Sequence, residues 1–285
     1  MCGFFAIIKK KKIKKKCFFN SSNLIKHRGP NHNSFVDNKK ILVRFFRLSI
    51  RDVSKKSNQP MHSEDNRYLM AFNGEIYNTK ELIKKYKLGK SFNYKSDTKI
   101  LFYLLCKYKL SILKHIKGMF SIFFTDNKNN ITYIIRDRFG IKPLYYSDHT
   151  DGLIVSSEIK PIINYKKKVK VNIKAASDFF LRGFMDHDEK TFIKNINSVE
   201  PGYYLEIKGK NLKKIKYWEL NIKADKESFQ TSLKNIKQKT KLSINQHLIS
   251  DQKIGFFLSG GQDSKTLVQN SKKIEKRPTT ITYDF

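Results

Sequence analysis

The chain begins with the string Met1-Cys2-Gly3. Because methionine is normally removed when a small residue follows it, we expect Cys2 to become the first residue of the mature chain. Cys2 would then carry a thiol nucleophile together with an α-amine, whose ordinary pKa of about 8 suits a general base near neutral pH. Activation of a nucleophile by an N-terminal amine is a recognised form of catalysis. The alternative is a cysteine that stands here by chance, so the remaining residues must decide.

A second candidate for chemistry is the string Ser259-Gly260-Gly261-Gln262-Asp263-Ser264, which follows an apolar run at 254–258. Glycines let the backbone approach a phosphate, and the N-terminus of a helix supplies amides and a positive dipole. The string lacks the Gly-Lys-Ser/Thr ending of a Walker loop. It resembles instead the pyrophosphate loop of ATP pyrophosphatases, which form adenylates and release pyrophosphate. An ordinary turn is the alternative.

The elements that must position Cys2 are short strands with turns between them. We expect residues 9–16 to form a solvated turn and Asn73-Gly74 to form a sharp turn directly after a strand. Helices are expected near 24–30, at 79–86 and from Ser96-Asp97-Thr98 to Cys106 or beyond. Strands are expected at 3–8, 41–46, 68–72, 119–125, 131–136, 144–146, 153–155 and 202–207. This pattern indicates an α+β domain with helices against antiparallel sheets.

The C-terminal part has a different pattern. Residues 208–224 are basic and predicted to be irregular, and a helical pattern covers 229–248. The apolar strand, the Ser259–Ser264 string, a helix and a strand at 279–285 then follow, which is typical of a parallel α/β domain. The predicted organisation is therefore a first domain at 2–207, a linker at 208–225 and the start of a second domain at 226–285.

Composition limits the classes of function. The chain has 285 residues and a formal net charge of +33, with the basic residues spread along its whole length. We interpret this charge as compositional drift, with nonspecific attraction to polyanions and no specific nucleic-acid partner. Cys2, Cys17 and Cys106 form no CxxC pair, which favours a reducing compartment over a disulfide scaffold or structural zinc. We find no signal peptide and no apolar run long enough to cross a membrane, and we predict a cytoplasmic protein.

Taken together, the motifs resemble a glutamine-dependent asparagine synthetase, a class II amidotransferase with an N-terminal nucleophile. Related amidotransferases share the N-terminal cysteine and the Asn-Gly string, whereas His27-Arg28-Gly29-Pro30 and the pyrophosphate loop point to the asparagine synthetase branch. Besides the strings already quoted, the resemblance rests on Arg47-Leu48-Ser49-Ile50, Asn73-Gly74-Glu75-Ile76-Tyr77-Asn78, Gly118-Met119-Phe120, the block 136–146, Ser157-Glu158-Ile159-Lys160 and Pro201-Gly202.

The resemblance implies an α-β-β-α glutaminase sandwich followed by an α/β domain of the ATP-pyrophosphatase type. It implies that the Cys2 thiolate attacks the side-chain amide of glutamine, and that the Asn73 side chain and the Gly74 N–H stabilise the oxyanion. Arg47 would hold the glutamine carboxylate, and Asp97, assisted by Glu75, would hold its ammonium. Leu48, Ser49 and Ile50 complete the implied glutamine site. His27-Arg28 and the block 136–146 are expected to be architectural.

For the second domain, the resemblance implies activation of aspartate as β-aspartyl-AMP with ATP and Mg²⁺, followed by displacement of AMP by ammonia. Asp263 would also contact the metal. The pyrophosphate end of ATP would lie against Ser259, Gly260, Gly261, Asp263 and Ser264, and the nucleoside near Leu258 and Tyr283.

Several features depart from the family pattern. Gln262 and Lys265 replace an aliphatic residue and a Ser or Thr, Arg51 replaces a small apolar residue, and Lys99 replaces an acid. Only residues 226–285 follow the linker, and an adenylating domain needs several times that length. We therefore expect the synthetase half to be incomplete, or completed by a second polypeptide, and a homodimer is compatible with the sequence. The alternatives are an amidotransferase with another acceptor, such as a sugar or a cell-surface precursor, a decayed inactive fragment, and a basic binding protein.

Overall fold

The structure is a computed structural model that describes residues 1–184, 187–222, 227–271 and 278–283. The chain divides into two compact units. Unit 1 contains residues 1–49, 54–76 and 98–219, and unit 2 contains 50–53, 77–97 and 220–285. Unit 2 thus takes two short segments from the range predicted as the first domain. The domain limits 2–207, 208–225 and 226–285 remain predictions, and residues 223–226 lie outside the described part of the chain.

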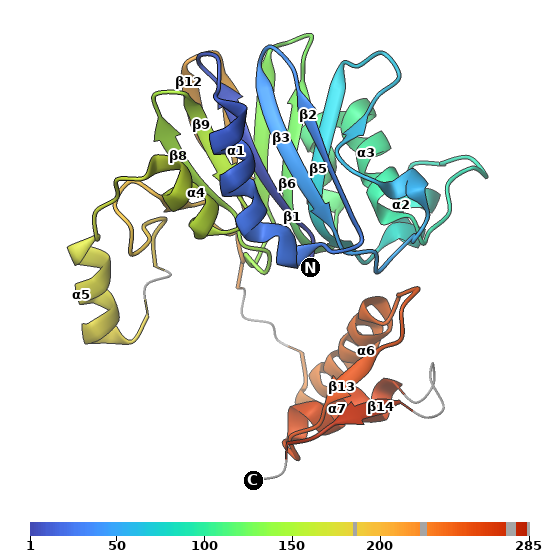
Figure 1. Ribbon diagram of the computed structural model, residues 1–285. Coiled ribbons are helices and arrows are strands. Elements are labelled where there is room, and N and C mark those ends of the chain that lie inside the picture. Colours follow the sequence, from blue (N-terminus) through green and yellow to red (C-terminus); the bar gives the residue numbers. More distant parts are fainter. Residues whose placement is uncertain (185–186, 223–226, 272–277, 284–285) are drawn as a thin grey trace. The chain divides into compact units, whose positions relative to one another are not determined.

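Unit 1 contains two antiparallel sheets of six strands each, and Cys2 directly precedes a central strand of the first (Figure 1). Because β1 pairs with β3 on one side and with β9 on the other, its backbone is held along its whole length. The order of the first sheet is β10 (Asn197–Ser198), β8 (Tyr145–His149), β9 (Gly152–Ser156), β1 (Gly3–Lys9), β3 (Ile41–Arg47) and β2 (His32–Asp37).

The second sheet carries the Asn73-Gly74 string in β5, which pairs with β6 throughout. We predicted a sharp turn at Asn73-Gly74, and this prediction is wrong because β5 continues to Ile76, with Gly74 opposite Phe120. The order of this sheet is β12 (Asn211–Lys216), β11 (Tyr203–Lys208), β7 (Ile131–Arg136), β6 (Gly118–Asp126), β5 (Tyr68–Ile76) and β4 (Met61–His62).

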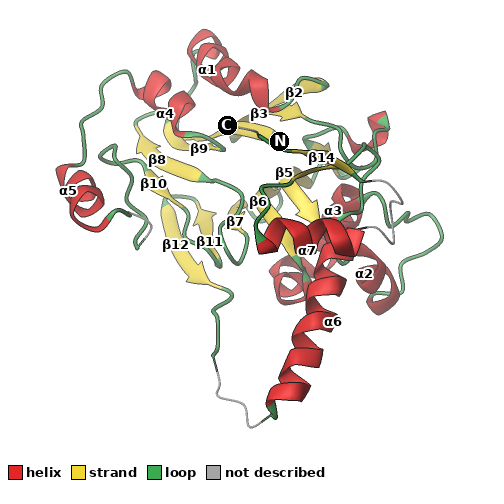
Figure 2. Ribbon diagram, turned by 90° about the horizontal axis from the view of Figure 1, so that it is seen from below, coloured by secondary structure: helices red, strands yellow, loops and turns green. Residues whose placement is uncertain are grey.

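Alternation along β1 explains the layers. Phe4 and Ala6 pack between the two sheets, whereas Phe5 and Ile7 face the opposite way, toward helices α1 (Lys15–Ser22) and α4 (Ile159–Lys166). Helix α3 (Asp97–Tyr108) lies beside the second sheet in both ribbon views (Figures 1 and 2). The layers therefore run helix, sheet, sheet, helix, which is the α+β sandwich that we predicted. The remaining helices of unit 1 are α5 (Ile173–Arg182) and the 3-10 helices η1 (Asn23–Arg28), η2 (Lys55–Ser57) and η3 (Lys109–His115).

All eight strands predicted for this part are present, and two further local predictions fail besides the turn at Asn73-Gly74. The solvated turn expected at 9–16 ends early because α1 begins at Lys15 and buries Phe18 against β1. The irregular structure expected at 208–224 is wrong for β12, since Asn211–Lys216 pairs with β11. In both places lysines dominate the sequence and obscure a regular element.

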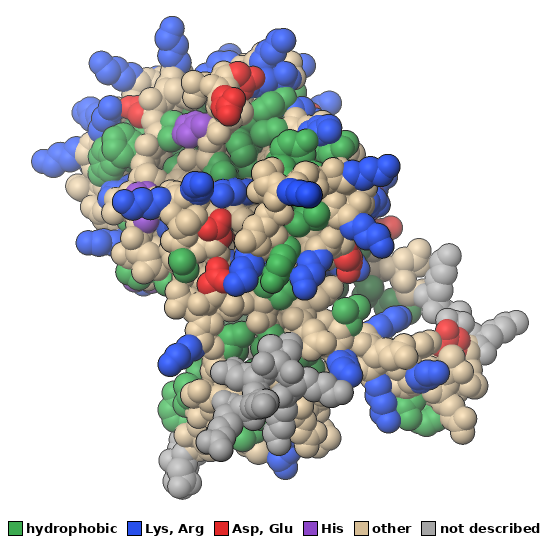
Figure 3. All heavy atoms as spheres, turned by 90° about the vertical axis from the view of Figure 1, so that its right-hand side faces the viewer, with side chains coloured by type: hydrophobic (Ala, Val, Ile, Leu, Met, Phe, Trp, Pro, Cys, Tyr) green, Lys and Arg blue, Asp and Glu red, His purple; other side chains and the backbone are tan. Residues whose placement is uncertain are grey.

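One face of the molecule shows the lysine and arginine side chains dispersed among other groups (Figure 3).

Unit 2 is built around a parallel strand–helix–strand series. Strands β13 (Gly255–Phe257) and β14 (Thr279–Ile281) pair in parallel, and helix α7 (Gln262–Ser271) lies between them in the sequence. The parallel pairing predicted here is confirmed for these strands. The strand predicted over 279–285 ends at Ile281, and residues 284–285 lie outside the described part of the chain. Helices α2 (Thr79–Lys85) and α6 (Phe229–His247) complete the unit. No helix in the described ranges is long and apolar enough to cross a membrane.

Candidate active site

The Cys2 thiol lies against the end of β3. The β1–β3 register pairs Gly3 with Phe46, so Cys2 falls beside the residues that leave β3. The Leu48 N–H donates to Cys2 Sγ at 3.3 Å, and the thiol approaches the Leu48 carbonyl oxygen at 3.5 Å. Antiparallel pairing thus brings together Cys2 and the Arg47-Leu48 string, which lie 45 residues apart in the chain.

The buried Arg28 side chain fixes the backbone of Cys2. Its Nε donates to the Cys2 carbonyl oxygen at 2.9 Å, and its Nη1 donates to Glu158 Oε1 at 2.9 Å. A Cβ at Gly3 would meet Arg28 Cδ at 2.8 Å, so glycine makes room for this arginine. The supporting role expected for His27-Arg28 is therefore visible in the contacts of Arg28, and His27 Nε2 also contacts Glu158 at 3.0 Å.

Burial dominates the electrostatics of the thiol. Burial raises the pKa of Cys2, while the Leu48 N–H, the terminal amine, Arg47 and Lys142 each lower that pKa in part. Burial also lowers the pKa of the terminal amine, and Arg28 and Lys142 lower it further, whereas Cys2 opposes them. In this structure that amine belongs to Met1. Because burial keeps the Cys2 thiol protonated at rest, a neighbouring base must take its proton before the sulfur can attack.

Arg47 is buried and held from within unit 1. Its Nη1 donates to the Ser54 carbonyl oxygen at 2.8 Å and to Asn58 Oδ1 at 2.7 Å. Two residues further along, the N–H of Ser49 donates to Asn31 Oδ1 at 2.9 Å. A guanidinium fixed in this way presents a preorganised fork to a carboxylate.

Asn73 and Gly74 lie in β5, a strand that contacts β1. The Asn73 side chain is 1% exposed, and its Nδ2 lies 3.5 Å from Ser121 Oγ of β6. A Cβ at Gly74 would meet the Met119 carbonyl oxygen at 2.2 Å, so the two strands approach too closely there for a side chain. A buried amide group and a glycine backbone at adjacent positions are suitable donors to a developing oxyanion.

Lys142 lies in the block expected to be architectural, yet its charge acts on the Cys2 thiol. Its side chain is only 5% exposed, and it interacts electrostatically with the Cys2 thiol and the Glu75 carboxylate. Burial lowers the pKa of Lys142, and Arg28 lowers it further, whereas Glu75, Cys2 and Asp137 oppose this shift. A lysine within a loop string gives no sign of burial, so the sequence alone could not have separated Lys142 from its neighbours.

The loop that carries Lys142 is wound around Asp137, a fully buried carboxylate. The Asp137 carboxylate accepts hydrogen bonds at 3.0–3.1 Å from the backbone N–H groups of Phe120, Phe139, Ile141 and Lys142. Arg136 adds a hydrogen bond from its Nε to the Lys142 carbonyl oxygen at 3.0 Å. The architectural role expected for the block 136–146 is therefore visible here, and its result is to hold the Lys142 backbone in one place.

Ile50 and Asp97 belong to unit 2 and are described with it. Asp97 is the first residue of α3, and its Oδ2 lies 3.7 Å from Nη1 of Arg51. Both side chains of this ion pair are almost fully buried. The Ile50 carbonyl oxygen accepts the N–H of Asp251 at 3.0 Å, which ties the 50–53 segment to the residues that precede β13.

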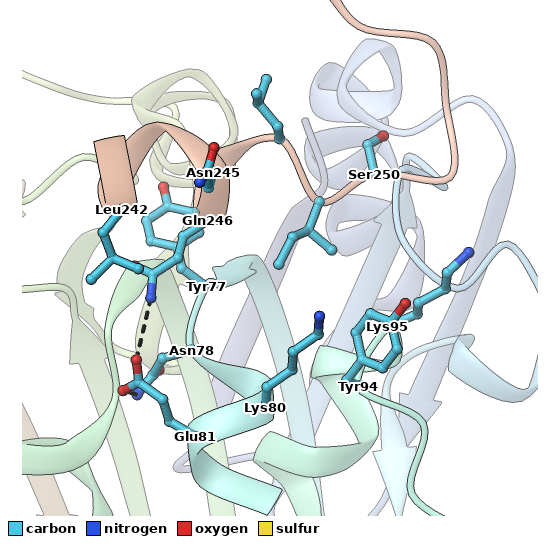
Figure 4. A pocket seen from close by; sticks show the side chains of 12 residues that line it. Tyr77, Asn78, Lys80, Glu81, Tyr94, Lys95, Leu242, Asn245, Gln246 and Ser250 are labelled. Atoms are coloured by element: carbon cyan, nitrogen blue, oxygen red, sulfur yellow. Dashed lines mark hydrogen bonds between the residues drawn. The ribbon is translucent and has the colours of Figure 1, made fainter. Parts of the chain in front are cut away.

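Unit 2 also contains a cavity of about 550 Å³ beside the end of α6 (Figure 4). Gln246 Nε2 donates to Glu81 Oε1 at 3.3 Å, and Lys80 Nζ lies 4.6 Å from the centre of the Tyr94 ring. Polar side chains thus line part of the cavity, beside apolar ones such as Leu242 and Leu248. Its lining residues are Tyr77, Asn78, Lys80, Glu81, Tyr94, Lys95, Leu242, Asn245, Gln246, Leu248, Ile249 and Ser250.

The Ser259–Ser264 string forms the connection from β13 to α7. Gly260 has a φ of +78°, a conformation that favours glycine, and a Cβ there would meet nothing within 4 Å. Ser264 Oγ donates to the Gly261 carbonyl oxygen at 3.0 Å, and α7 begins at Gln262, with Asp263 in its first turn. Leu258 continues the strand pairing through its N–H to the Ile281 oxygen at 2.9 Å, and Tyr283 is exposed.

This connection fits a phosphate group better than it fits a complete metal site. The open glycine backbone leads directly into a helix N-terminus, which suits an anion. Asp263 is the one carboxylate in the first turn of α7, and in the described ranges no three His, Cys, Asp or Glu side chains are grouped so as to hold a metal ion. A single carboxylate together with phosphate oxygens is, however, a usual arrangement for Mg²⁺.

Comparison with known proteins identifies the family of the domain that carries Cys2. A glutamine amidotransferase domain family matches residues 1–218, which cover unit 1 almost completely. Among solved structures, the chain is similar to a glutamine phosphoribosylpyrophosphate amidotransferase from B. subtilis, with a TM-score of 0.57 and 15% identity over 99% of this chain and 65% of that one. At this identity, the similarity shows the fold alone.

Two curated relatives come from Bacillus subtilis (strain 168). Asparagine synthetase [glutamine-hydrolyzing] 1 is 30% identical over an alignment of 292 residues, gaps included, that covers 100% of this chain and 46% of that protein. Asparagine synthetase [glutamine-hydrolyzing] 2 is 34% identical over 282 residues, which cover 93% of this chain and 38% of that protein. The chain thus spans less than half the length of these relatives. By its fold, its N-terminal cysteine and the family match over most of its length, the chain belongs to the glutamine amidotransferase domain family.

Proposed function

We propose that this chain is the glutaminase part, with the beginning of the synthetase part, of a glutamine-hydrolysing asparagine synthetase. The observation that carries the proposal is Cys2 at the start of β1, with its thiol against Leu48 and its carbonyl held by Arg28. Glutamine is the substrate of this site. Arg47 holds its α-carboxylate and Asp97, assisted by Glu75, holds its α-ammonium, while Leu48, Ser49 and Ile50 line the remaining contacts.

In the proposed reaction, removal of Met1 leaves the α-amine on Cys2 itself. The amine takes the thiol proton as sulfur adds to the side-chain carbonyl carbon of glutamine. The oxyanion that forms accepts hydrogen bonds from the Asn73 side chain and the Gly74 N–H. The amine returns its proton to the leaving nitrogen, ammonia departs, and water then hydrolyses the thioester to glutamate. Lys142, a buried cation that interacts with the thiol, favours the thiolate during attack.

The second half of the proposal concerns the use of the ammonia. ATP and Mg²⁺ supply adenylation of the aspartate β-carboxylate, which ammonia then converts to asparagine. Ser259, Gly260, Gly261 and Ser264 would hold the pyrophosphate end, Asp263 would contact the metal, and Leu258 and Tyr283 would lie near the nucleoside. The same proposal includes a homodimer and a cytoplasmic location, which would keep Cys2 reduced. The test is release of AMP by an enzyme with a complete synthetase domain. The acceptor whose addition causes this release, aspartate or another carboxylate, is the substrate.

The test is glutamine hydrolysis by the purified chain with a native N-terminus at Cys2. We expect Cys2→Ala to lower kcat by about 10³-fold or more, since the nucleophile is lost. The electrophilic glutamine analogue 6-diazo-5-oxo-norleucine is expected to label one residue, Cys2, as read by peptide mass spectrometry. Cys17→Ala is the matched control, because Cys17 is also a free, half-buried cysteine of unit 1. Hydrolysis by Cys2→Ala at the rate of the unmodified chain would refute the mechanism.

A further inference from the structure

Arg51 places a cation against Asp97. The two side chains are 3% and 4% exposed, and Arg51 Nη1 lies 3.7 Å from Asp97 Oδ2. A buried carboxylate with a guanidinium beside it has much of its charge offset before any ligand arrives, because water screens such a pair only weakly. An incoming ammonium must then share Asp97 with Arg51.

Hydrogen bonds hold Arg51 in this position. Its Nη2 donates to the Tyr94 carbonyl oxygen at 3.0 Å, and that oxygen also accepts the Thr79 hydroxyl at 2.7 Å. Tyr94 and Thr79 belong to the same unit as Arg51 and Asp97. A long side chain that is buried and anchored at its guanidinium cannot leave Asp97 without losing these contacts.

The backbone on either side of Arg51 is clamped by Asp251. Asp251 Oδ2 accepts the N–H of Asp52 at 2.9 Å, and the N–H of Asp251 donates to the Ile50 carbonyl oxygen at 3.0 Å. Asp251 Oδ1 in turn pairs with Lys95 Nζ at 3.0 Å. The residues before and after Arg51 are therefore tied to one carboxylate-bearing residue, which fixes the direction from which Arg51 reaches Asp97.

We propose that Arg51 is a specificity-determining residue that makes the amide-donor site nearly indifferent to an α-ammonium group. This inference rests on the proposed role of Asp97 in glutamine binding. With Arg51 in place, the site takes γ-carboxamide acids that lack the α-ammonium almost as well as it takes glutamine. A lone buried Asp97 would instead select the ammonium through a charged hydrogen bond, an interaction that corresponds to about 10- to 150-fold in affinity.

The direct measurement compares glutamine with glutaramate, which is glutamine with hydrogen in place of the α-ammonium. For the chain that begins at Cys2, we expect the two kcat/KM values to agree within about tenfold. A larger preference for glutamine would overturn the inference. This measurement needs no variant, so it decides the question even if substitution of Arg51 prevents folding.

Two variants then test Arg51 itself. Arg51→Ile and Arg51→Gln are expected to raise the preference for glutamine over glutaramate by about tenfold or more, through a lower KM for glutamine at unchanged kcat. Arg67→Gln is the matched control because it breaks another arginine pair with a buried acid, Arg67–Asp126 at 3.0 Å in unit 1. An unchanged preference in folded Arg51 variants would refute the role of Arg51.

Failure of the proposed function gives a different result. If neither amide is hydrolysed and 6-diazo-5-oxo-norleucine does not label Cys2, the glutaminase proposal fails. If Cys2 is labelled and glutamine is hydrolysed with strong preference over glutaramate, the glutaminase proposal stands and only the inference about Arg51 fails.

Discussion

The surroundings of Cys2 and the Ser259–Ser264 string are two candidate sites of opposite construction. Around Cys2, the groups proposed for chemistry are buried, and partners from distant segments contact Asn73 and the Cys2 backbone. In the Ser259–Ser264 string, the hydrogen bonds are local, and most of the residues are exposed. One site depends on a complete sandwich, whereas the other depends on a continuous stretch of chain.

The packing of the two units explains this difference. In unit 1, each face of β1 meets a separate layer of apolar side chains, so Cys2 starts from a rigid backbone. In unit 2, β13 and β14 form a sheet of two strands, and Phe257 and Ile281 remain 70% and 48% exposed. A two-stranded pair gives little independent stability. We therefore expect substitutions around Cys2 to have large effects and those in the string to have small ones.

The largest effect that we expect within this comparison is on catalysis by Asn73. Asn73→Ala removes a proposed oxyanion donor and should lower kcat for glutamine by about 10²- to 10³-fold with little change in KM. Steady-state kinetics of the chain that begins at Cys2 measure this. Asn129→Ala, at an exposed asparagine of unit 1, is the control. A higher KM with unchanged kcat would show that Asn73 binds substrate and does not stabilise the transition state.

Substitution of alanine for Gly74 in unit 1 and for Gly260 in unit 2 tests the difference in packing between the two units. Gly74→Ala should destabilise the chain by about 3 kcal/mol, because its Cβ would meet backbone atoms of β6 that cannot move independently. Gly260→Ala should cost about 1 kcal/mol, since only the positive φ is strained and the space is open. Urea unfolding measures both values. Equal losses would contradict the claim that only the Cys2 region is tightly packed.

The smallest effect concerns the acidity of the nucleophile. Lys142 lowers the pKa of Cys2, so Lys142→Met should raise that pKa and slow alkylation of Cys2 by iodoacetamide several-fold at pH 8. The pH at which alkylation reaches half its maximum rate should move upward. Lys166→Met is the control, because burial also lowers the pKa of Lys166, and the charged group that opposes this shift is Asp148 rather than Cys2. An unchanged pH profile would remove Lys142 from the thiol environment.

The sequence determined most of the elements. Alternating apolar residues and turn residues located the eight predicted strands of unit 1, and Cys2 was placed at the start of β1. Helix α3 began at Asp97, next to the expected cap, and the glycine string preceded α7. These predictions succeed because each depends on a periodicity or a cap that lies within a few consecutive residues. The same local patterns failed at α1 and β12, where lysines hide the pattern, and at Gly74, where strand pairing overrides the turn preference of Asn-Gly.

Only the tertiary structure decided which side chains act on one another. Arg28 bonds to the Cys2 carbonyl, Lys142 interacts with the thiol, and Arg51 pairs with Asp97, and in each case the two residues are far apart in the chain. In the sequence, nothing shows that these three cations are buried while most other basic residues lie at the surface. Burial gives them their effect, since removal of water strengthens each charge on its neighbour, and burial is a property of the packed layers rather than of any local string.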